Sequence, residues 1–399
     1  MANKDIQLNT APKLGLSGFK CDIQLCLYVT LICNFFILLG NPVKNSFMVS
    51  WATRPLILLV FAMTVLAIIN MVRKVRVETA DVYFLAVICL SAISMAVAGV
   101  SGVLKAAVSY LCFLMLPGYI VLYRRADNIS RLKMAVYIAN VLYTGIYIYY
   151  RFTDRAFSFR DEYGEKIIED LTLGYRNPNE TGMYLMLSFF IMLSAAFAAK
   201  KWWQRWGAFL LSGVLFYLLW ETDSRSCIAL AAIVLILAVF KWLPRLKMGA
   251  RLIAFLIPLI SLVLVRVIPD TLKELNFMGE AMDTGRYFVF NRYFDGLTVG
   301  SFLFGDVAKY PGNNMHNSYL SILAMFGVLV TIVYILFFNT SLKAYYNKLS
   351  NTQSYVAYAG VLAVIIHGAA EGALLMAGTV YAGMTGLLFL LMLPEETDP

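Results

Sequence analysis

Long apolar runs separated by short polar breaks dominate the hydropathy pattern of this chain. Each run is roughly 17 to 22 residues long, enough for a helix rising 1.5 Å per residue to cross a hydrocarbon core about 30 Å thick. We therefore predict an all-α, polytopic integral membrane protein with about twelve transmembrane helices, in a single membrane domain over residues 1–399. The predicted spans are Cys21 to Leu39, Pro55 to Val72, Val82 to Ala98, Gly102 to Leu122, Leu132 to Tyr150, Gly182 to Ala199, Trp203 to Trp220, Ser226 to Lys241, Leu252 to Ile268, Ser318 to Phe338, Ser354 to Gly372 and Leu374 to Leu393.

Two long polar segments, residues 151–181 and 269–317, interrupt this pattern. The first mixes basic and acidic side chains, and the spacing of Glu162 and Lys166 favours a solvated, amphipathic helical lid. In the second, Arg286 begins a segment with aromatic and apolar residues on one helical face. That is the arrangement of an amphipathic helix in the membrane interface, and we expect it to carry part of the active site.

Composition excludes a water-soluble domain. Apolar residues make up 60% of the chain and charged residues 14%, and the mean hydropathy is +0.72. A soluble protein of this size would aggregate with so much apolar surface. The six cysteines all fall in or beside predicted spans, so we expect no disulfide framework, and the first apolar run is predicted to remain as an anchor.

Basic residues are concentrated in the breaks on one side of the predicted spans. Lysine and arginine in short loops resist translocation, so this side is predicted to be cytoplasmic, with both termini there and the two long loops outside. The net charge of +9 follows from this bias and indicates contact with anionic lipid rather than nucleic acid. The basic residues are Lys4, Lys13, Lys20, Arg73, Lys74, Arg76, Arg124, Arg125, Arg131, Lys133, Lys200, Lys201, Arg205, Lys241, Arg245, Lys247, Arg251, Lys343 and Lys348.

The chain lacks the residues that several kinds of chemistry require. The chain has no phosphate-binding glycine loop, no HExxH motif and only two histidines, so we expect no nucleotide, no metal and no cofactor. The middles of the spans carry almost no charge, whereas coupled transporters keep ionisable groups there. An enzyme acting at the outer face is therefore the preferred interpretation, and a polytopic transporter or flippase remains the alternative.

Four short motifs of the outer face together resemble the bacterial O-antigen ligase and polymerase superfamily, over roughly residues 175 to 372. The motifs are Asn177-Pro178-Asn179-Glu180-Thr181-Gly182, Asp223-Ser224-Arg225-Ser226, Gly285-Arg286, and His316-Asn317-Ser318-Tyr319-Leu320 with Gly327. The resemblance implies a membrane glycosyltransferase-like fold in the bacterial cytoplasmic (inner) membrane. It also implies an undecaprenyl-pyrophosphate-linked oligosaccharide as donor, membrane lipid as surroundings, and a flippase and chain-length regulator as possible partners.

The resemblance assigns His316 to the glycosyl transfer centre and Arg225 and Arg286 to the pyrophosphate. His316 directly precedes a predicted helix that Asn317 or Ser318 can cap, and the positive end of the helix dipole favours the neutral imidazole that accepts a proton. A guanidinium offers paired donors to a diphosphate. The alternatives are an interfacial His316 that bonds a loop carbonyl, and an Arg225 that pairs with a neighbouring acid, Glu221 or Asp223, or contacts a lipid headgroup.

A second set of residues is predicted to bind substrate around this centre. Arg292 stands six residues from Arg286, about 120° away on a helix, and an ion pair with Asp295 is its ordinary explanation. His367 and Glu371 lie four apart on one predicted helical face, and packing against each other is their alternative. The full set is Arg292, Asn177, Asn179, Asn317, His367 and Glu371.

These features predict an inverting, metal-independent glycosyl transfer to a hydroxyl outside the cytoplasmic membrane. Repeat-unit polymerisation for O-antigen or capsule is preferred, and ligation of finished chains to a lipid A core is the alternative.

Overall fold

The predicted all-α class is confirmed. A computed structural model describes residues 23–40, 47–72, 77–97, 103–126, 128–153, 157–162, 165–175, 178–244, 249–272, 276–277, 280–281, 286–307, 309–310, 315–371 and 378–394. Helices dominate this part of the chain, and two small hairpins accompany them. The helices are α1 (Ile23–Gly40), α2 (Phe47–Val72), α3 (Thr79–Val97), α4 (Val103–Tyr123), α5 (Ile129–Arg151), α6 (Pro178–Ala198), α7 (Trp202–Trp220), α8 (Arg225–Val239), α9 (Gly249–Leu272), α10 (Arg286–Asp295), α11 (Val299–Phe304), α12 (Ser318–Tyr346), α13 (Thr352–His367) and α15 (Gly378–Met392). The strands are β1 (Phe157–Glu162), β2 (Glu165–Leu171), β3 (Asn276–Phe277) and β4 (Glu280–Ala281).

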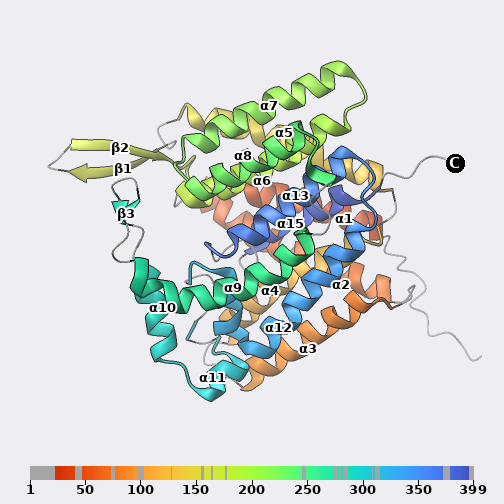
Figure 1. The fold of residues 1–399 in the computed structure, drawn as a ribbon. Coiled ribbons are helices and arrows are strands. Elements are labelled where there is room, and N and C mark those ends of the chain that lie inside the picture. Colours follow the sequence, from red (N-terminus) through yellow and green to blue (C-terminus); the bar gives the residue numbers. More distant parts are fainter. Residues whose placement is uncertain are drawn as a thin grey trace, which may run out of the picture.

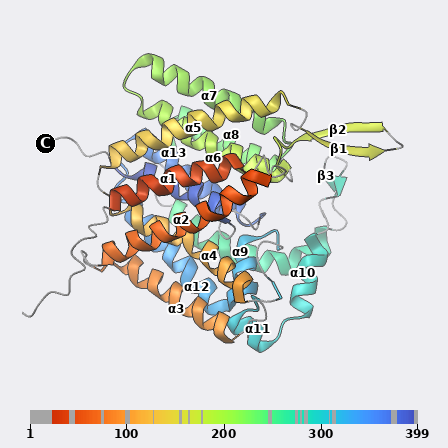
Figure 2. The ribbon, with the colours of Figure 1, turned by 180° about the vertical axis from the view of Figure 1, so that it is seen from behind.

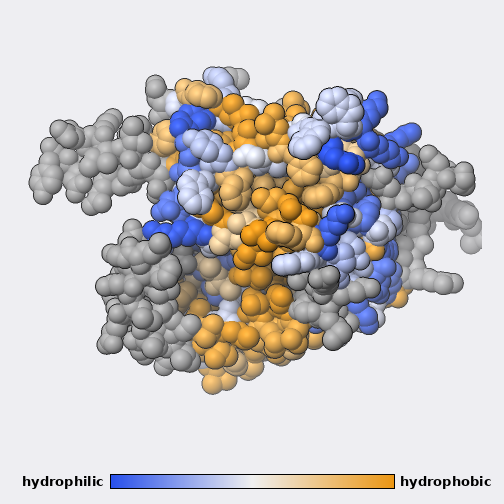
Figure 3. Space-filling view, turned by 45° about the horizontal axis from the view of Figure 1, so that its top comes forward, coloured by the Kyte–Doolittle hydropathy of each residue, from blue (hydrophilic) through white to orange (hydrophobic). Residues whose placement is uncertain are grey.

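Each apolar run predicted from the sequence overlaps a helix. Three helices, α3, α6 and α12, are long and apolar enough to cross a membrane by length and composition, among the residues that the structure describes. Hydrophobic side chains gather in a band across one face of the molecule, with hydrophilic residues on both sides of the band (Figure 3). This distribution is the one that a bilayer requires. Twelve crossings and a glycosyltransferase-like fold remain predictions.

Helix α6 is the centre of the bundle. Every residue from Thr181 to Ala196 is buried, as expected for a helix that is apolar on all sides. It packs against α5, α7, α8, α13 and α15, while α12 packs against α3, α9 and α11. Helices α6 and α12, which begin at or beside the predicted site residues Asn179 and Asn317, are therefore held by neighbours on several sides.

Both long polar segments lie at one end of the bundle. The hairpin β1–β2 and helices α10 and α11 gather there, on the left in Figure 1 and on the right in Figure 2. The first turns of α6 and α12 adjoin these segments in the chain, and the turn before α8 is bonded to β2. This end of the bundle is where the predicted site residues are placed.

The helical lid predicted for the first polar segment is wrong. Strands β1 and β2 form an antiparallel hairpin in which Asp161 pairs in register with Lys166 and Glu162 with Glu165. Aromatic residues at Phe157 and Phe159 favour strand, and so do the β-branched residues of β2, while the connecting sequence contains a glycine. Strand propensity and hairpin pairing thus outweigh the four-residue charge spacing.

A two-point ion pair fastens the base of this hairpin to the turn between α7 and α8. The Arg151 Nε and Nη2 atoms each donate to a carboxylate oxygen of Glu221 at 2.8 Å, and the Arg151 guanidinium lies 4.6 Å from the Phe157 ring centre. The Leu171 amide donates to the Glu221 carbonyl at 3.1 Å. The hydrogen-bonded guanidinium holds the pKa of the Glu221 carboxyl below its ordinary value.

We expect Glu221→Gln to loosen the hairpin and to lower stability by about 1 kcal/mol at neutral pH, because one charge-assisted pair is lost. A lowered carboxyl pKa stabilises the fold above the ordinary value of about 4.3, and this contribution disappears as the pH falls through the lowered value. The difference in thermal stability between wild type and Glu221→Gln should therefore be constant at neutral pH and shrink on acidification.

Hydrogen exchange of a peptide spanning β2 measures the loosening directly. Asp223→Asn is the matched control, because Asp223 lies on the same turn and is 61% exposed. Equal exchange in wild type and Glu221→Gln would show that the ion pair does not hold the hairpin.

Helix α12 is interrupted one-third of the way along, where Gly327 adopts φ 81° and ψ 177°. Gly305, with φ 70°, follows α11 and crosses this interruption at backbone contact. The Asp306 amide donates to the Ala324 carbonyl at 2.8 Å, and the Ser94 hydroxyl donates to the Phe326 carbonyl at 2.8 Å. These bonds satisfy carbonyls that the interrupted helix leaves open, so the first part of α12 is fixed in place.

Candidate functional site

The loop before α12 is bonded to the turn after α13. Asn317 is the N-cap of α12, and its Oδ1 accepts from the Leu320 amide at 2.9 Å. Its Nδ2 donates to the Ala369 carbonyl at 2.8 Å, and the Ser318 amide donates to the Gly368 carbonyl at 2.7 Å. Asn317 and Ser318 are fully buried. Asn317, predicted to bind substrate, thus joins two segments at the site.

His316 and Glu371 face each other across this junction. The His316 Nδ1 atom lies 3.6 Å from the Glu371 Oε2 atom, which is ion-pair range but longer than a hydrogen bond. The imidazole is 45% exposed and the carboxylate 12% exposed. His316 has φ 44°, a left-handed conformation that costs a residue with a Cβ about 1 kcal/mol or more. The hydrogen-bonded junction holds it there.

His367 and Glu371, for which packing against each other was the alternative to substrate binding, lie at the end of α13 and in the turn that follows it. Helix α13 ends at His367, short of the predicted Gly372, and the turn carries the chain on to Glu371. The Ser318 hydroxyl donates to the Glu371 carbonyl at 2.7 Å, which joins the backbone of this residue to the start of α12. His316 is thus a neighbour of the Glu371 carboxylate, and α8 is a neighbour of His367.

A buried thiol links His367 to α8. The Cys227 Sγ atom lies 3.4 Å from the His367 Nε2 atom, and both residues are buried. The contact joins positions 140 residues apart in the chain. Cys227 was not predicted as a site residue, and its only sequence signal is its place two residues after Arg225, on the opposite side of the same helical turn.

Arg225 is the first residue of α8 and lies on the exposed side of that turn. Its Nη2 atom lies 3.6 Å from the Asp223 Oδ2 atom, and the side chains are 52% and 61% exposed. Asp223 is one of the two acids considered as its partner, and the other, Glu221, binds Arg151 instead. A pair this exposed is screened by solvent, which leaves the guanidinium accessible to an anionic substrate.

The start of α6 adjoins the same turn. Pro178 is the first residue of α6, a position that proline favours, and Asn179 follows in the first turn. A Cβ on Gly182 would lie 2.5 Å from the Ser224 Cβ atom, so α6 and the start of α8 are in close contact. Asn179 is therefore at the Arg225 end of the site, while Asn177 lies outside the described residues.

Helix α10 packs beside His316. Tyr293 is buried in a cluster with Val265, Met315 and Leu320, so the helix lies against α9 and against the residue that precedes His316. Arg286 is the first residue of α10, and its side chain lies outside the described part of the structure. Seven residues separate Arg286 from Tyr293, or about 10 Å along a helix.

The ion pair with Asp295, considered as the alternative to substrate binding by Arg292, is not formed between these two described side chains. Both residues are exposed on α10, and no contact within ion-pair range joins them among the side chains that the structure describes. A spacing of three residues permits such a pair on a helix surface, but water competes for both charges. Arg292 thus presents its charge to solvent at this end of the bundle.

Taken together, three predicted site residues meet through direct contacts. His316 faces Glu371, the carbonyl of His367 accepts the Glu371 amide at 2.9 Å, and His367 contacts α8 through Cys227. Among the described residues, no group of three or more His, Cys, Asp or Glu side chains is placed to hold a metal ion. The arrangement can accept a proton at an exposed imidazole beside a carboxylate, with arginine on a neighbouring helix.

Comparison with protein-family models, with curated proteins and with solved structures finds no match to this chain. The fold itself defines the class: an all-helical protein with helices apolar enough to cross a membrane.

Proposed function

We propose that this chain transfers a glycosyl group from an undecaprenyl-pyrophosphate-linked oligosaccharide to a hydroxyl acceptor, at the outer face of the bacterial cytoplasmic membrane. The observation that carries the proposal is the half-exposed His316, with a carboxylate 3.6 Å from its Nδ1 atom and α10 packed against the preceding residue, Met315. Helix α8 contacts the same junction through Cys227 and His367. A base that is oriented by an acid and is accessible to solvent is what a hydroxyl nucleophile needs.

In this mechanism the Nε2 atom of His316 receives the proton of the acceptor hydroxyl. The hydroxyl oxygen bonds to the anomeric carbon as the bond from that carbon to the pyrophosphate breaks, which inverts the configuration. Glu371 stabilises the imidazolium that forms, and Arg225 and Arg286 stabilise the charge that develops on undecaprenyl pyrophosphate. The proton later leaves His316 for solvent.

The donor supplies its own activation. A sugar linked to pyrophosphate already has a good leaving group, so the reaction needs no nucleotide. Arginine can neutralise the departing diphosphate without losing its proton, which is the role that a divalent ion takes elsewhere. We therefore propose a metal-independent reaction. The preferred acceptor is another repeat unit, which gives polymerisation, and the alternative acceptor is a lipid A core, which gives ligation of finished chains.

The interruption of α12 favours one different function, transport. Discontinuous helices line substrate sites in many transporters, and Gly327 breaks α12 where the helix is surrounded by protein. A flippase would move the lipid-linked oligosaccharide without joining it to anything. The two functions differ in whether a new glycosidic bond is formed.

The purified full-length protein in liposomes, given undecaprenyl-pyrophosphate-linked repeat units, tests the proposal. We expect longer glycans and free undecaprenyl pyrophosphate, and we expect the yield to survive excess EDTA. Glycan joined to lipid A core, when core is supplied, would assign the ligase instead. Movement of the substrate across the bilayer with no new glycosidic bond would overturn the enzyme proposal, and loss of activity in EDTA that magnesium restores would overturn the metal-independent mechanism.

A further inference from the structure

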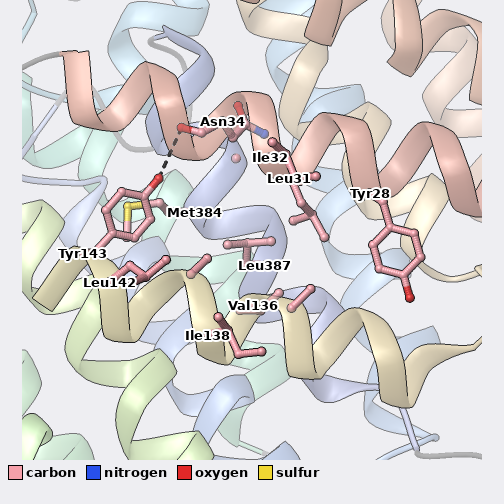
Figure 4. A pocket seen from close by; sticks show the side chains of 13 residues that line it. Tyr28, Leu31, Ile32, Asn34, Val136, Ile138, Leu142, Tyr143, Met384 and Leu387 are labelled. Atoms are coloured by element: carbon pink, nitrogen blue, oxygen red, sulfur yellow. Dashed lines mark hydrogen bonds between the residues drawn. The ribbon is translucent and has the colours of Figure 1, made fainter. Parts of the chain in front are cut away.

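A lateral groove lies between α1, α5 and α15, away from the residues of the candidate site. Its volume is about 320 Å³. The side chains of α1 and α5 point toward each other across it, and those of α15 form its floor (Figure 4). Residues that define its walls and floor are Leu31, Ile32, Ala139, Leu142, Met384 and Leu387.

The groove is open on the side that faces away from the bundle. Ile32 and Ile138 are 55% and 56% exposed on its two rims. The wall segments belong to the middle turns of α1, α5 and α15, far from the helix ends. In a bilayer this position is surrounded by the hydrocarbon core, which is about 30 Å thick.

Most polar groups at one end of the groove bind each other. The Tyr143 hydroxyl donates to the Asn34 carbonyl at 3.3 Å (Figure 4). The Asn34 Nδ2 atom donates to the Tyr119 hydroxyl at 3.0 Å, and the Asn34 Oδ1 atom alone among these groups has no hydrogen-bond partner in the described part of the chain. The remaining lining is almost entirely aliphatic. A headgroup or sugar would find few hydrogen-bond partners here, whereas a hydrocarbon chain needs none.

We propose that this groove holds one acyl chain of a membrane phospholipid. An apolar cavity of about 150 Å³ is enough for a benzene ring, so a groove about twice that size holds a longer hydrocarbon segment. Burial from water does not drive the binding, because the acyl chain is already in the hydrocarbon of the bilayer. The binding depends instead on dispersion contacts between the acyl chain and the α15 side chains that form the floor. We choose phospholipid because it is the most abundant lipid around a membrane-embedded helix bundle. The groove also lies apart from the helix ends that carry the candidate site.

This inference rests on the membrane location of the bundle and is independent of the glycosyl transfer proposal. Native mass spectrometry of the full-length protein, extracted in mild detergent and exchanged through several detergent washes, tests it. We expect wild type to retain one phospholipid per chain and Ala139→Trp to retain at least tenfold less. Val141→Trp is the matched control, because Val141 is exposed on the same helix but does not line the groove.

A smaller substitution separates filling of the groove from misfolding. In lipid-free detergent we expect Ala139→Leu to raise the thermal midpoint above that of wild type, because it occupies space that the acyl chain would fill. Added phospholipid should then raise the midpoint of wild type and of Val141→Trp, but not that of Ala139→Leu. Retention of a polyprenyl lipid, absence of bound phospholipid in wild type, or equal responses of all the variants to phospholipid would each overturn the proposal.

Discussion

Replacing His316 with asparagine should reduce glycosyl transfer by about a hundred- to ten-thousand-fold, the range that a positioned general base contributes. Asparagine tolerates the left-handed backbone that His316 adopts at φ 44°, so the fold should survive. Its amide nitrogen occupies a place close to that of the imidazole Nδ1 atom, but it cannot accept a proton. Single-turnover rates with lipid-linked repeats measure the loss.

Substitutions farther from the imidazole should reduce the rate of glycosyl transfer less. Glu371→Gln should cost about tenfold, less than His316→Asn, because its Oε2 atom lies 3.6 Å away and acts only by orienting and stabilising the imidazole. Asp295→Asn, on the exposed surface of α10, should leave the rate unchanged. Wild-type rates for His316→Asn, in protein that is extracted as a monodisperse species, would remove this residue from the chemistry.

Gly327→Ala should destabilise the protein by about 3 kcal/mol or more, the largest effect on stability that we expect of any single methyl group here. A Cβ at this position would lie 2.2 Å from the Leu303 carbonyl oxygen and 2.6 Å from the Phe304 nitrogen. Both are backbone atoms, so no side-chain rotation can relieve the clash. The left-handed φ of 81° adds about 1 kcal/mol for any residue with a Cβ.

Gly213→Ala is the matched control, since nothing lies within 4 Å of a Cβ at that helical position. Alanine has the higher helix propensity, so this variant should equal or exceed wild type in stability. Thermal unfolding of both purified variants in one detergent measures the difference. Equal midpoints for Gly327→Ala and wild type would mean that α11 and α12 do not cross at this contact.

Loss of the Gly327 contact should also reach the candidate site. The crossing holds the first part of α12, whose N-cap Asn317 is bonded to the turn that carries Glu371. Gly327 appeared in the sequence only as one member of a motif. The motif did not indicate that α11 crosses α12 at Gly327. That crossing also requires Gly305, which lies outside the motif.

The helical lid, an incorrect prediction, and the Arg292–Asp295 ion pair, the alternative to substrate binding by Arg292, were inferred in the same way. In each, the spacing of charged residues was taken as evidence for a helix-surface contact. Glu162 and Lys166 instead lie in a hairpin, and Arg292 and Asp295 keep their charges in water. Charge pairs at helical spacing contribute only about 0.2–0.5 kcal/mol, too little to outweigh strand propensity or hydration.

The amino-acid sequence was enough to predict the helical class, the order of the apolar helices and the polar segments that carry the candidate residues. These properties depend on local composition and on long runs of apolar side chains, which can be read one segment at a time. Helix packing, in contrast, places His316 opposite Glu371, Cys227 against His367 and Gly305 across Gly327. Such contacts join helices distant in the chain, and they depend on how whole helices pack, which no local pattern encodes.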